Sequence, residues 1–405
     1  EHLDEYTERL IKVAEADNYA YEESSINLPF DGDVLEKILK TKEKYVNKKL
    51  KYVLDIGIGG SNLGTKAIYD AFYGSFDLIE PERYPKMIFA DTNDPTYIYK
   101  LYNFIRKKVK DPEELLINAV SKSGKTTETI VNLEIIASGI PFAKERLVIT
   151  TAYNSDLWKA ARSLKLDCLP VPNKVGGRFS VFSSVGLFPL AAVGVDVAEL
   201  LEGAMEARKI CLTKNHFKNP AALSAILQFE NYVKGKLISD SFIFHPELES
   251  LGKWYRQLLA ESVGKDGKGI TPTVSIGSTD LHSMGQLYLG GIKDKYFTFI
   301  SAKNTNSDIS VPQEPVIEIL SEVEEKTTSE IMNAILAGVK ISFAKGGLPF
   351  VEIILDDISL ESLGQFMQFK MMEIMYLGQL LGVNAFDQPS VESYKQETRK
   401  ILLEK

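Results

Sequence analysis

Short apolar runs alternate with longer amphipathic runs along most of the chain. In the first half, five apolar runs have the length of strands and cover residues 52–56, 87–90, 115–120, 147–151 and 166–171. Between them, apolar residues recur every three or four positions, which predicts helices at about 63–73, 96–107, 126–137 and 156–163. Strands that alternate with helices in this order form a parallel sheet with helices on both faces.

The same alternation returns in the second half of the chain. Strands are predicted at 241–244, 273–276, 296–300 and 350–355, with helices at 249–263, 280–290 and 360–381 and from Val391 onwards. Residues 1–46 and 172–238 are predicted to be mainly helical. The fold class is therefore α/β, with an N-terminal helical segment (1–46), two doubly wound parallel-sheet domains (47–200 and 201–385) and a C-terminal helix (386–405).

Composition and charge narrow the possible partners. The 405 residues are 44% apolar and carry a net charge of −8, which argues against nucleic acid or an anionic membrane as the main partner. A local basic pocket for a small anion stays compatible with this charge. The most apolar run, residues 179–195, is too short to span a membrane and contains three serines and Pro189, so we expect a buried helix there.

The number of cysteines and the first residues of the chain indicate in which cellular compartment to expect the protein. Only Cys168 and Cys211 are present, which excludes a disulfide framework, and no CxxC pattern suggests zinc. The first residues, EHLDEY, are polar and acidic, unlike a secretory signal peptide. We therefore expect a cytoplasmic protein.

The predicted helix 249–263 carries the first candidate for chemistry. Its apolar face includes Trp254 and Leu258, and Glu261 lies at the edge of that face, one turn after Gln257. Gly264 is the predicted stop. A carboxylate beside a Trp in the last turn of a helix is partly desolvated and faces the negative end of the helix dipole, conditions that suit a general base. The alternative is a glutamate that forms a salt bridge at the rim of the core.

The loop after strand 52–56 reads Gly57-Ile-Gly-Gly-Ser-Asn-Leu-Gly64 and suits an anion. Its glycines allow close approach of a ligand to the backbone, and the following helix offers free N–H groups to a phosphate. It does not match the dinucleotide pattern, because Asn62 stands where a glycine is needed, nor the P-loop, because Thr65-Lys66 has the wrong order. The alternative is a tight strand-to-helix turn.

The loop after strand 115–120, residues 121–129, combines five hydroxyl side chains with two lysines, which could surround one phosphate. Gly124-Lys125-Thr126 also resembles the end of a Walker A motif, with Asp91 as a Walker B carboxylate. This second interpretation predicts a P-loop-like nucleotidase. It is weakened by Ala119, which replaces the first glycine of that motif, and it leaves the loop 57–64 without a role.

Three further residues are candidates. Arg178 follows two glycines, which let the chain bend so that a permanently charged guanidinium reaches a pocket and an oxyanion within it. Asp280 is a suitable N-cap for a helix 281–290, which would place His282 in its first turn, and a histidine there can exchange protons near neutral pH. Lys395 lies in the last helix. Structural roles are the alternatives for His282 and Lys395.

Taken in order, these motifs resemble the bacterial type of the glucose-6-phosphate isomerase (phosphoglucose isomerase) family. The resemblance rests on GIGGSNLG, SKSGKTTET, GGRFSVFSSVGL, AESVGK, STDLHS and VNAFDQPSVESYK, and covers about residues 50–400. It implies two sugar-isomerase (SIS) domains. It also implies a homodimer that binds a sugar phosphate and interconverts glucose 6-phosphate and fructose 6-phosphate without metal or redox cofactor.

The resemblance also implies roles for single residues. Glu261 is the base that moves a proton between C1 and C2 through a cis-enediol, and Arg178 lies beside the enediolate oxygen. Lys395 assists ring opening, as does His282, which reaches the active site of the neighbouring subunit. The substrate and phosphate contacts implied are Gln257, Gly60, Ser61, Ser121, Lys122, Ser123 and Thr126.

The sequence departs from many relatives at three positions. Ser390 and Tyr394 stand where glycines are common, which makes the placement of Lys395 less certain, and Ser123 replaces Thr but keeps the hydroxyl. A further alternative is a non-catalytic SIS-type sugar-phosphate-binding protein. The presence of Glu261, His282 and Arg178 together argues against it, since binding alone needs no base.

Overall fold

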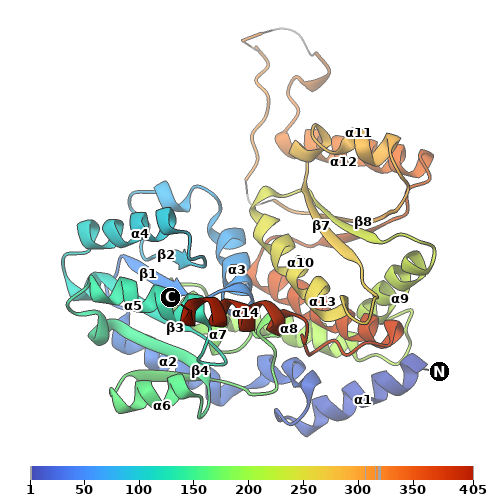
Figure 1. The fold of residues 1–405 in the computed structure, drawn as a ribbon. Helices are drawn as coiled ribbons and strands as arrows, with labels where there is room; N and C mark the ends of the chain where they lie inside the picture. The colour runs from blue at the N-terminus through green and yellow to red at the C-terminus, as the bar shows by residue number, and fades with distance from the viewer. Residues whose placement is uncertain (1, 306, 315, 318–320, 405) are drawn as a thin grey trace.

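The computed structural model describes residues 2–305, 307–314, 316–317 and 321–404, and contains two parallel sheets (Figure 1). The first has the order β2-β1-β3-β4-β5, with β1 (Tyr52–Ile56), β2 (Lys86–Ala90), β3 (Leu115–Val120), β4 (Leu147–Ala152) and β5 (Asp167–Val171). The second has the order β7-β6-β8-β9, with β6 (Ile238–Ile243), β7 (Thr271–Ile276), β8 (Lys295–Ala302) and β9 (Phe350–Leu355). The prediction of an α/β fold with two parallel sheets is confirmed.

Helices cover both faces of the first sheet. One apolar cluster joins it to α4 (Pro95–Lys108), α5 (Thr127–Ser138) and α6 (Asp156–Ser163), and another joins it to α2 (Gly32–Tyr45), α3 (Leu63–Tyr73) and α7 (Ser184–Ala192). Every residue of α7 is buried, as its apolar sequence predicts. It begins later than residue 179, because the residues Gly177–Phe179 form a separate 3₁₀ turn.

The second sheet is covered in the same way. Its outer apolar cluster includes α11 (Gly285–Gly290) and α12 (Thr328–Lys345), and its other face packs against α10 (Glu249–Val263) and α13 (Leu360–Leu381). Helix α12 was not predicted, although Thr327 and Glu330 form a capping box at its start. Helix α9 (Pro220–Val233) packs against α13.

The predicted helix 280–290 is wrong at its start. The structure has a 3₁₀ turn at Thr279–Leu281, and α11 begins only at Gly285 with Met284 as its N-cap. Asp280 is therefore not an N-cap of that helix. Its carboxylate accepts hydrogen bonds from the Ile276 N–H and the Ser283 hydroxyl, both at 2.7 Å, and so closes the turn instead.

Helices α8 (Val197–Cys211) and α13 form the centre of the molecule. They cross with their backbones in contact at two glycines: a Cβ atom on Gly203 would lie 1.9 Å from the Glu361 carbonyl oxygen, and one on Gly364 would lie 2.0 Å from that of Leu200. Most side chains of α13 are buried. One apolar cluster contains residues of both sheets and of these two helices, so the two halves share a core.

The ends of the chain are helical, as predicted. The first 46 residues form α1 (His2–Ala16), a 3₁₀ segment (Glu22–Phe30) and α2. The last helix, α14 (Val391–Leu403), has no buried residues and crosses in front of the first-sheet half in Figure 1. None of the described helices combines the length and apolar content needed to cross a bilayer.

Candidate active site

A cleft of about 1670 Å³ lies at the carboxyl end of the first sheet, where ligands bind in folds of this kind. Loops after β1 and β3, the turn before α7, helix α10 and helix α14 all contribute to it. The predicted site residues that line it are Gly60, Ser61, Lys122, Ser123, Thr126, Arg178, Gln257, Glu261 and Lys395.

Arg178 is buried at the base of this cleft with 3% of its surface exposed. A guanidinium has five N–H groups, and each is directed to an acceptor. Burial lowers the pKa of Arg178, and the nearby negative charges of Glu261 and Asp387 oppose this shift. The acceptors are the Ser262 hydroxyl (2.8 Å), the Gln388 amide oxygen (3.1 Å), the Glu261 carboxylate (3.4 Å) and the carbonyls of Ala385 (2.6 Å) and Asp387 (3.0 Å).

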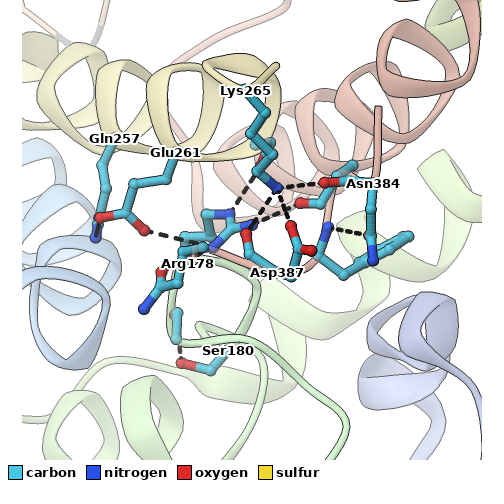
Figure 2. Close-up of polar contacts among 12 residues, drawn as sticks. Arg178, Ser180, Gln257, Glu261, Lys265, Asn384 and Asp387 are labelled. Carbon is cyan, nitrogen blue, oxygen red and sulfur yellow. Dashed lines mark hydrogen bonds and ion pairs between the residues drawn. The ribbon is translucent and has the colours of Figure 1, made fainter. Parts of the chain in front are cut away.

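Glu261 lies in the last turn of α10, whose stop at Gly264 is confirmed. Its side chain is 31% exposed, and its carboxylate points toward the Arg178 guanidinium (Figure 2). The Gln257 amide donates a hydrogen bond of 2.9 Å to Oε1, and Oε2 is the oxygen that pairs with Arg178. The helix spacing of four residues therefore lets Gln257 hold one carboxylate oxygen while the other is directed to Arg178.

The loop after β1 approaches the turn before Arg178 backbone to backbone. A Cβ atom on Gly60 would lie 2.3 Å from the carbonyl carbon of Gly177 and 2.5 Å from the Arg178 nitrogen, so only glycine fits. Gly59 has φ of +58°, in the left-handed region that favours glycine. This contact joins the candidate anion loop to the arginine.

The loop after β3 places its polar groups at the start of α5. The hydroxyls of Ser121 and Thr126 are 2.9 Å apart, and Thr126 is the N-cap of α5 without a side-chain bond to the helix. Ser121 itself is fully buried and is not among the described residues that line the cleft. Burial lowers the pKa of Lys122, with the positive charges of Arg178 and Lys174 adding to the effect.

The residues of the Walker-like interpretation do not assemble. Lys125 pairs with Asp156 at 2.9 Å on an exposed part of the loop. Asp91 lines a different cavity, beside β2 and α3. A P-loop nucleotidase needs a lysine and a carboxylate around one nucleotide and its Mg²⁺, so this arrangement disfavours that alternative.

The two candidates for ring opening differ in position. Lys395 lies on α14 at the rim of the cleft, and its Nζ donates to Glu392 at 2.7 Å. His282 is exposed, follows the 3₁₀ turn at Thr279–Leu281, and is not among the described residues that line the cleft.

Sequence reasoning missed three residues around Arg178. Gln388 lines the cleft and accepts a bond from the guanidinium. Lys265 and Asp387 form an ion pair of 2.7 Å next to it (Figure 2). The motif containing Asn384 to Gln388 was noted in the sequence, but nothing local indicated which of its groups would meet an arginine more than 200 positions earlier.

Comparison with known proteins identifies the family of the chain. The sequence model of the phosphoglucose isomerase family matches residues 33–289, which is more than half of the chain. The chain belongs to the phosphoglucose isomerase family. Its relatives include the glucose-6-phosphate isomerases of Methanocaldococcus jannaschii (38% identity, 85% of this chain, 82% of the relative) and Parabacteroides distasonis (36% identity, 88% and 81%).

Solved structures of related proteins have the same fold. A hypothetical protein from Thermus thermophilus matches with a TM-score of 0.87 at 30% identity, over 99% of this chain and 94% of that one. A glucose-6-phosphate isomerase from Chlamydia trachomatis matches with a TM-score of 0.79 at 23% identity, over 94% and 74%. The predicted membership of the phosphoglucose isomerase family and the predicted fold class are confirmed.

Proposed function

We propose that this protein interconverts glucose 6-phosphate and fructose 6-phosphate by proton transfer through a cis-enediol. The observation that carries the proposal is the pairing of the Glu261 carboxylate with the buried Arg178 guanidinium, in the same cleft as the anion-binding loops. An aldose–ketose isomerisation requires a base, a stabiliser for the enediolate oxygen and an anchor for the phosphate.

The phosphate is anchored by the loops after β1 and β3. The hydroxyls of Ser61, Ser123 and Thr126 and the ammonium of Lys122 lie along one side of the cleft, close to the free N–H groups at the start of α5. Ser121 orients the Thr126 hydroxyl from below. Gly60 keeps this side in contact with the turn that carries Arg178.

Glu261 moves the proton. In the open-chain aldose it takes the proton from C2, and the electron pair of that bond forms the C1–C2 double bond as O1 becomes protonated. Glu261 then returns the proton to C1 as O2 gives up its hydroxyl proton and becomes the ketone oxygen, so the proton that O2 loses balances the one that O1 gained. The contact of Arg178 Nη1 with Glu261 is the longest of the hydrogen bonds that Arg178 makes. During the reaction Nη1 gives up this contact and donates to the enediolate oxygen, whose negative charge it stabilises. Gln257 keeps the carboxylate in place.

Ring opening is assigned to Lys395 and His282. Lys395 stands at the rim of the cleft, and His282 is exposed away from it, as expected of a residue that serves the cleft of a second copy. We therefore propose a homodimer in which each subunit contributes His282 to its neighbour. Such an enzyme acts in the cytoplasm on glycolytic or gluconeogenic sugar phosphates, a location that also suits two free, buried cysteines.

The test is a coupled assay with each sugar phosphate and the Glu261→Gln variant. The amide keeps the shape of the side chain but removes its basicity, so we expect kcat to fall by about 10³-fold while binding of a sugar-acid phosphate inhibitor persists. Glu249→Gln, at the exposed start of the same helix, is the matched control and should be unaffected. Near-normal activity of Glu261→Gln would contradict the assignment, and a wild type that binds without turnover would favour the non-catalytic alternative.

A further inference from the structure

The connection between α13 and α14, residues 382–390, contacts the Arg178 guanidinium. It begins at Gly382 in the left-handed region, presents the carbonyls of Ala385 and Asp387 to Arg178, and places Gln388 in the cleft. It then leads into the helix that carries Lys395. The position of this connection therefore affects several groups of the cleft at once.

Lys265 also binds this connection. It lies four residues after Glu261, just beyond the end of α10, and only 7% of its side chain is exposed. Its Nζ donates to the carbonyl oxygen of Asn384, to the carbonyl oxygen of Asp387 (2.7 Å) and to the carboxylate of Asp387 (2.7 Å). An ammonium group has three N–H donors, so all three are directed to the connection (Figure 2).

Arg178 and Lys265 share an acceptor. The Asp387 carbonyl accepts from Arg178 Nη2 at 3.0 Å and from Lys265 Nζ at 2.7 Å. Between them, the two cations bind the carbonyls of residues 384, 385 and 387. Because Nη2 is fixed by two of these carbonyls, the direction of Nη1 toward Glu261 depends on where the connection lies.

We propose that Lys265 and Asp387 are positioning residues: their ion pair fixes the connection so that Arg178 presents Nη1 to the reacting oxygen. This inference rests on the proposed isomerase function and adds residues to it. Loss of the pair should lower kcat more than it raises KM, because the phosphate-binding loops after β1 and β3 make no described contact with either side chain. A small displacement of a group aimed at a transition state costs about 10- to 100-fold in rate.

The test compares Lys265→Met with Lys268→Met. Lys268 lies in the same short loop, and its Nζ donates to the Leu381 carbonyl at 2.7 Å, which belongs to the end of α13 and not to the Arg178 contacts. We expect Lys265→Met to lower kcat by about 10- to 100-fold with little change in KM. Lys268→Met should leave both constants near those of the wild type. Lys265→Arg, which keeps the charge, should recover part of the lost kcat.

A double mutant asks whether Lys265 acts through Arg178. In an Arg178→Lys background, which lacks the Nη2 group, adding Lys265→Met should reduce kcat much less than it does in the wild type. If Lys265→Met folds poorly by circular dichroism, Asp387→Asn removes the ion pair but keeps the backbone carbonyl, and it should lower kcat in the same way.

The outcomes separate the two proposals. The positioning role would be overturned if Lys265→Met and Lys268→Met had equal effects. It would also be overturned if Lys265→Met lowered kcat by the same factor in the Arg178→Lys background as in the wild type. Neither result would contradict the proposed isomerase function. A wild type that converts neither sugar phosphate would overturn the proposed function and, with it, this inference.

Discussion

Gly60 makes a close backbone contact that the sequence did not reveal. The sequence suggested that a glycine at this position allows a phosphate to approach the backbone. The structure adds a second reason for glycine, because the backbone of Gly177 and Arg178 leaves no room for a side chain. By contrast, a Cβ atom on Gly176 would meet its nearest neighbour at 3.5 Å, an ordinary van der Waals contact. Two glycines in contacting loops therefore differ in what they tolerate.

This difference predicts the behaviour of two alanine variants. Gly60→Ala forces apart the loop after β1 and the turn before Arg178, so we expect a large loss of kcat/KM and a decrease in the free energy of unfolding of about 1–3 kcal/mol. Gly176→Ala should be close to the wild type in both. Steady-state assays and urea unfolding measure the two effects. A fully active Gly60→Ala would mean that the contact has no role in the site.

Residues were predictable from the sequence where their chemistry is local. The position of Glu261 one turn after Gln257 and the stop at Gly264 follow from one helix pattern, and Arg178 was singled out by the two glycines before it. Gln388 and Lys265 could not be found in this way. Their partners lie 210 and 119 residues away, and only the tertiary fold brings those segments together.

At the scale of elements, β1 carries a buried carboxyl beneath the loop that follows it. Asp55 is fully buried, pairs in register with Asn118 of β3 and accepts a bond of 2.7 Å from its amide, and Asn118 in turn accepts from Thr150 of β4. Burial raises the pKa of Asp55 to about 8, aided by Asp91 and opposed by the Asn118 bond. The folded protein therefore favours the neutral carboxyl.

A raised pKa of an acid makes the folded state less stable as pH rises. The unfolded chain releases the Asp55 proton above about pH 4, whereas the folded protein retains it up to about pH 8. The contribution of Asp55 to the free energy of unfolding is therefore greatest below pH 4, decreases progressively up to pH 8 and stays constant above it. We expect Asp55→Asn, measured by urea unfolding, to gain stability relative to the wild type from pH 5 to 8. A difference independent of pH would contradict this.

Element boundaries were predicted well where the apolar pattern is strong. The bounds of β1, β3, β9, α3, α6, α10 and α13 match the predicted ranges. The helix at 280–290 was misjudged because Asp280 bonds back to the end of β7 and so closes a turn. Helix α12 was missed although its capping box was visible, and in the structure only Leu336 and Phe343 of this helix are buried.

At the scale of the whole molecule, the position of His282 bears on whether the active site is shared between two subunits. One chain brings Glu261, Arg178 and the loops after β1 and β3 to one cleft, but leaves His282 exposed elsewhere. The expectation that it completes a neighbour's cleft came from the family resemblance, and the position of the residue in the single chain is compatible with it. Such an arrangement couples activity to assembly.

Mixing two inactive variants tests the shared site. Glu261→Gln and His282→Ala subunits are combined, denatured and refolded, and activity is measured. If sites are shared, each heterodimer has one cleft with both lesions and one with neither, so an equal mixture should recover about a quarter of wild-type activity. Each variant refolded alone is the control. A mixture that stays inactive, or a monomer in sedimentation, would refute the shared site.

The crossing of α8 and α13 has a consequence for the chain while it is being made. About 150 residues separate the two helices, so α8 leaves the ribosome long before α13 exists. The first sheet can form early, but the apolar side of α8 stays uncovered until synthesis is nearly complete. A nascent chain that stalls before α13 therefore displays an apolar surface of the kind that chaperones bind, and we expect the cell to degrade it instead of accumulating half an enzyme.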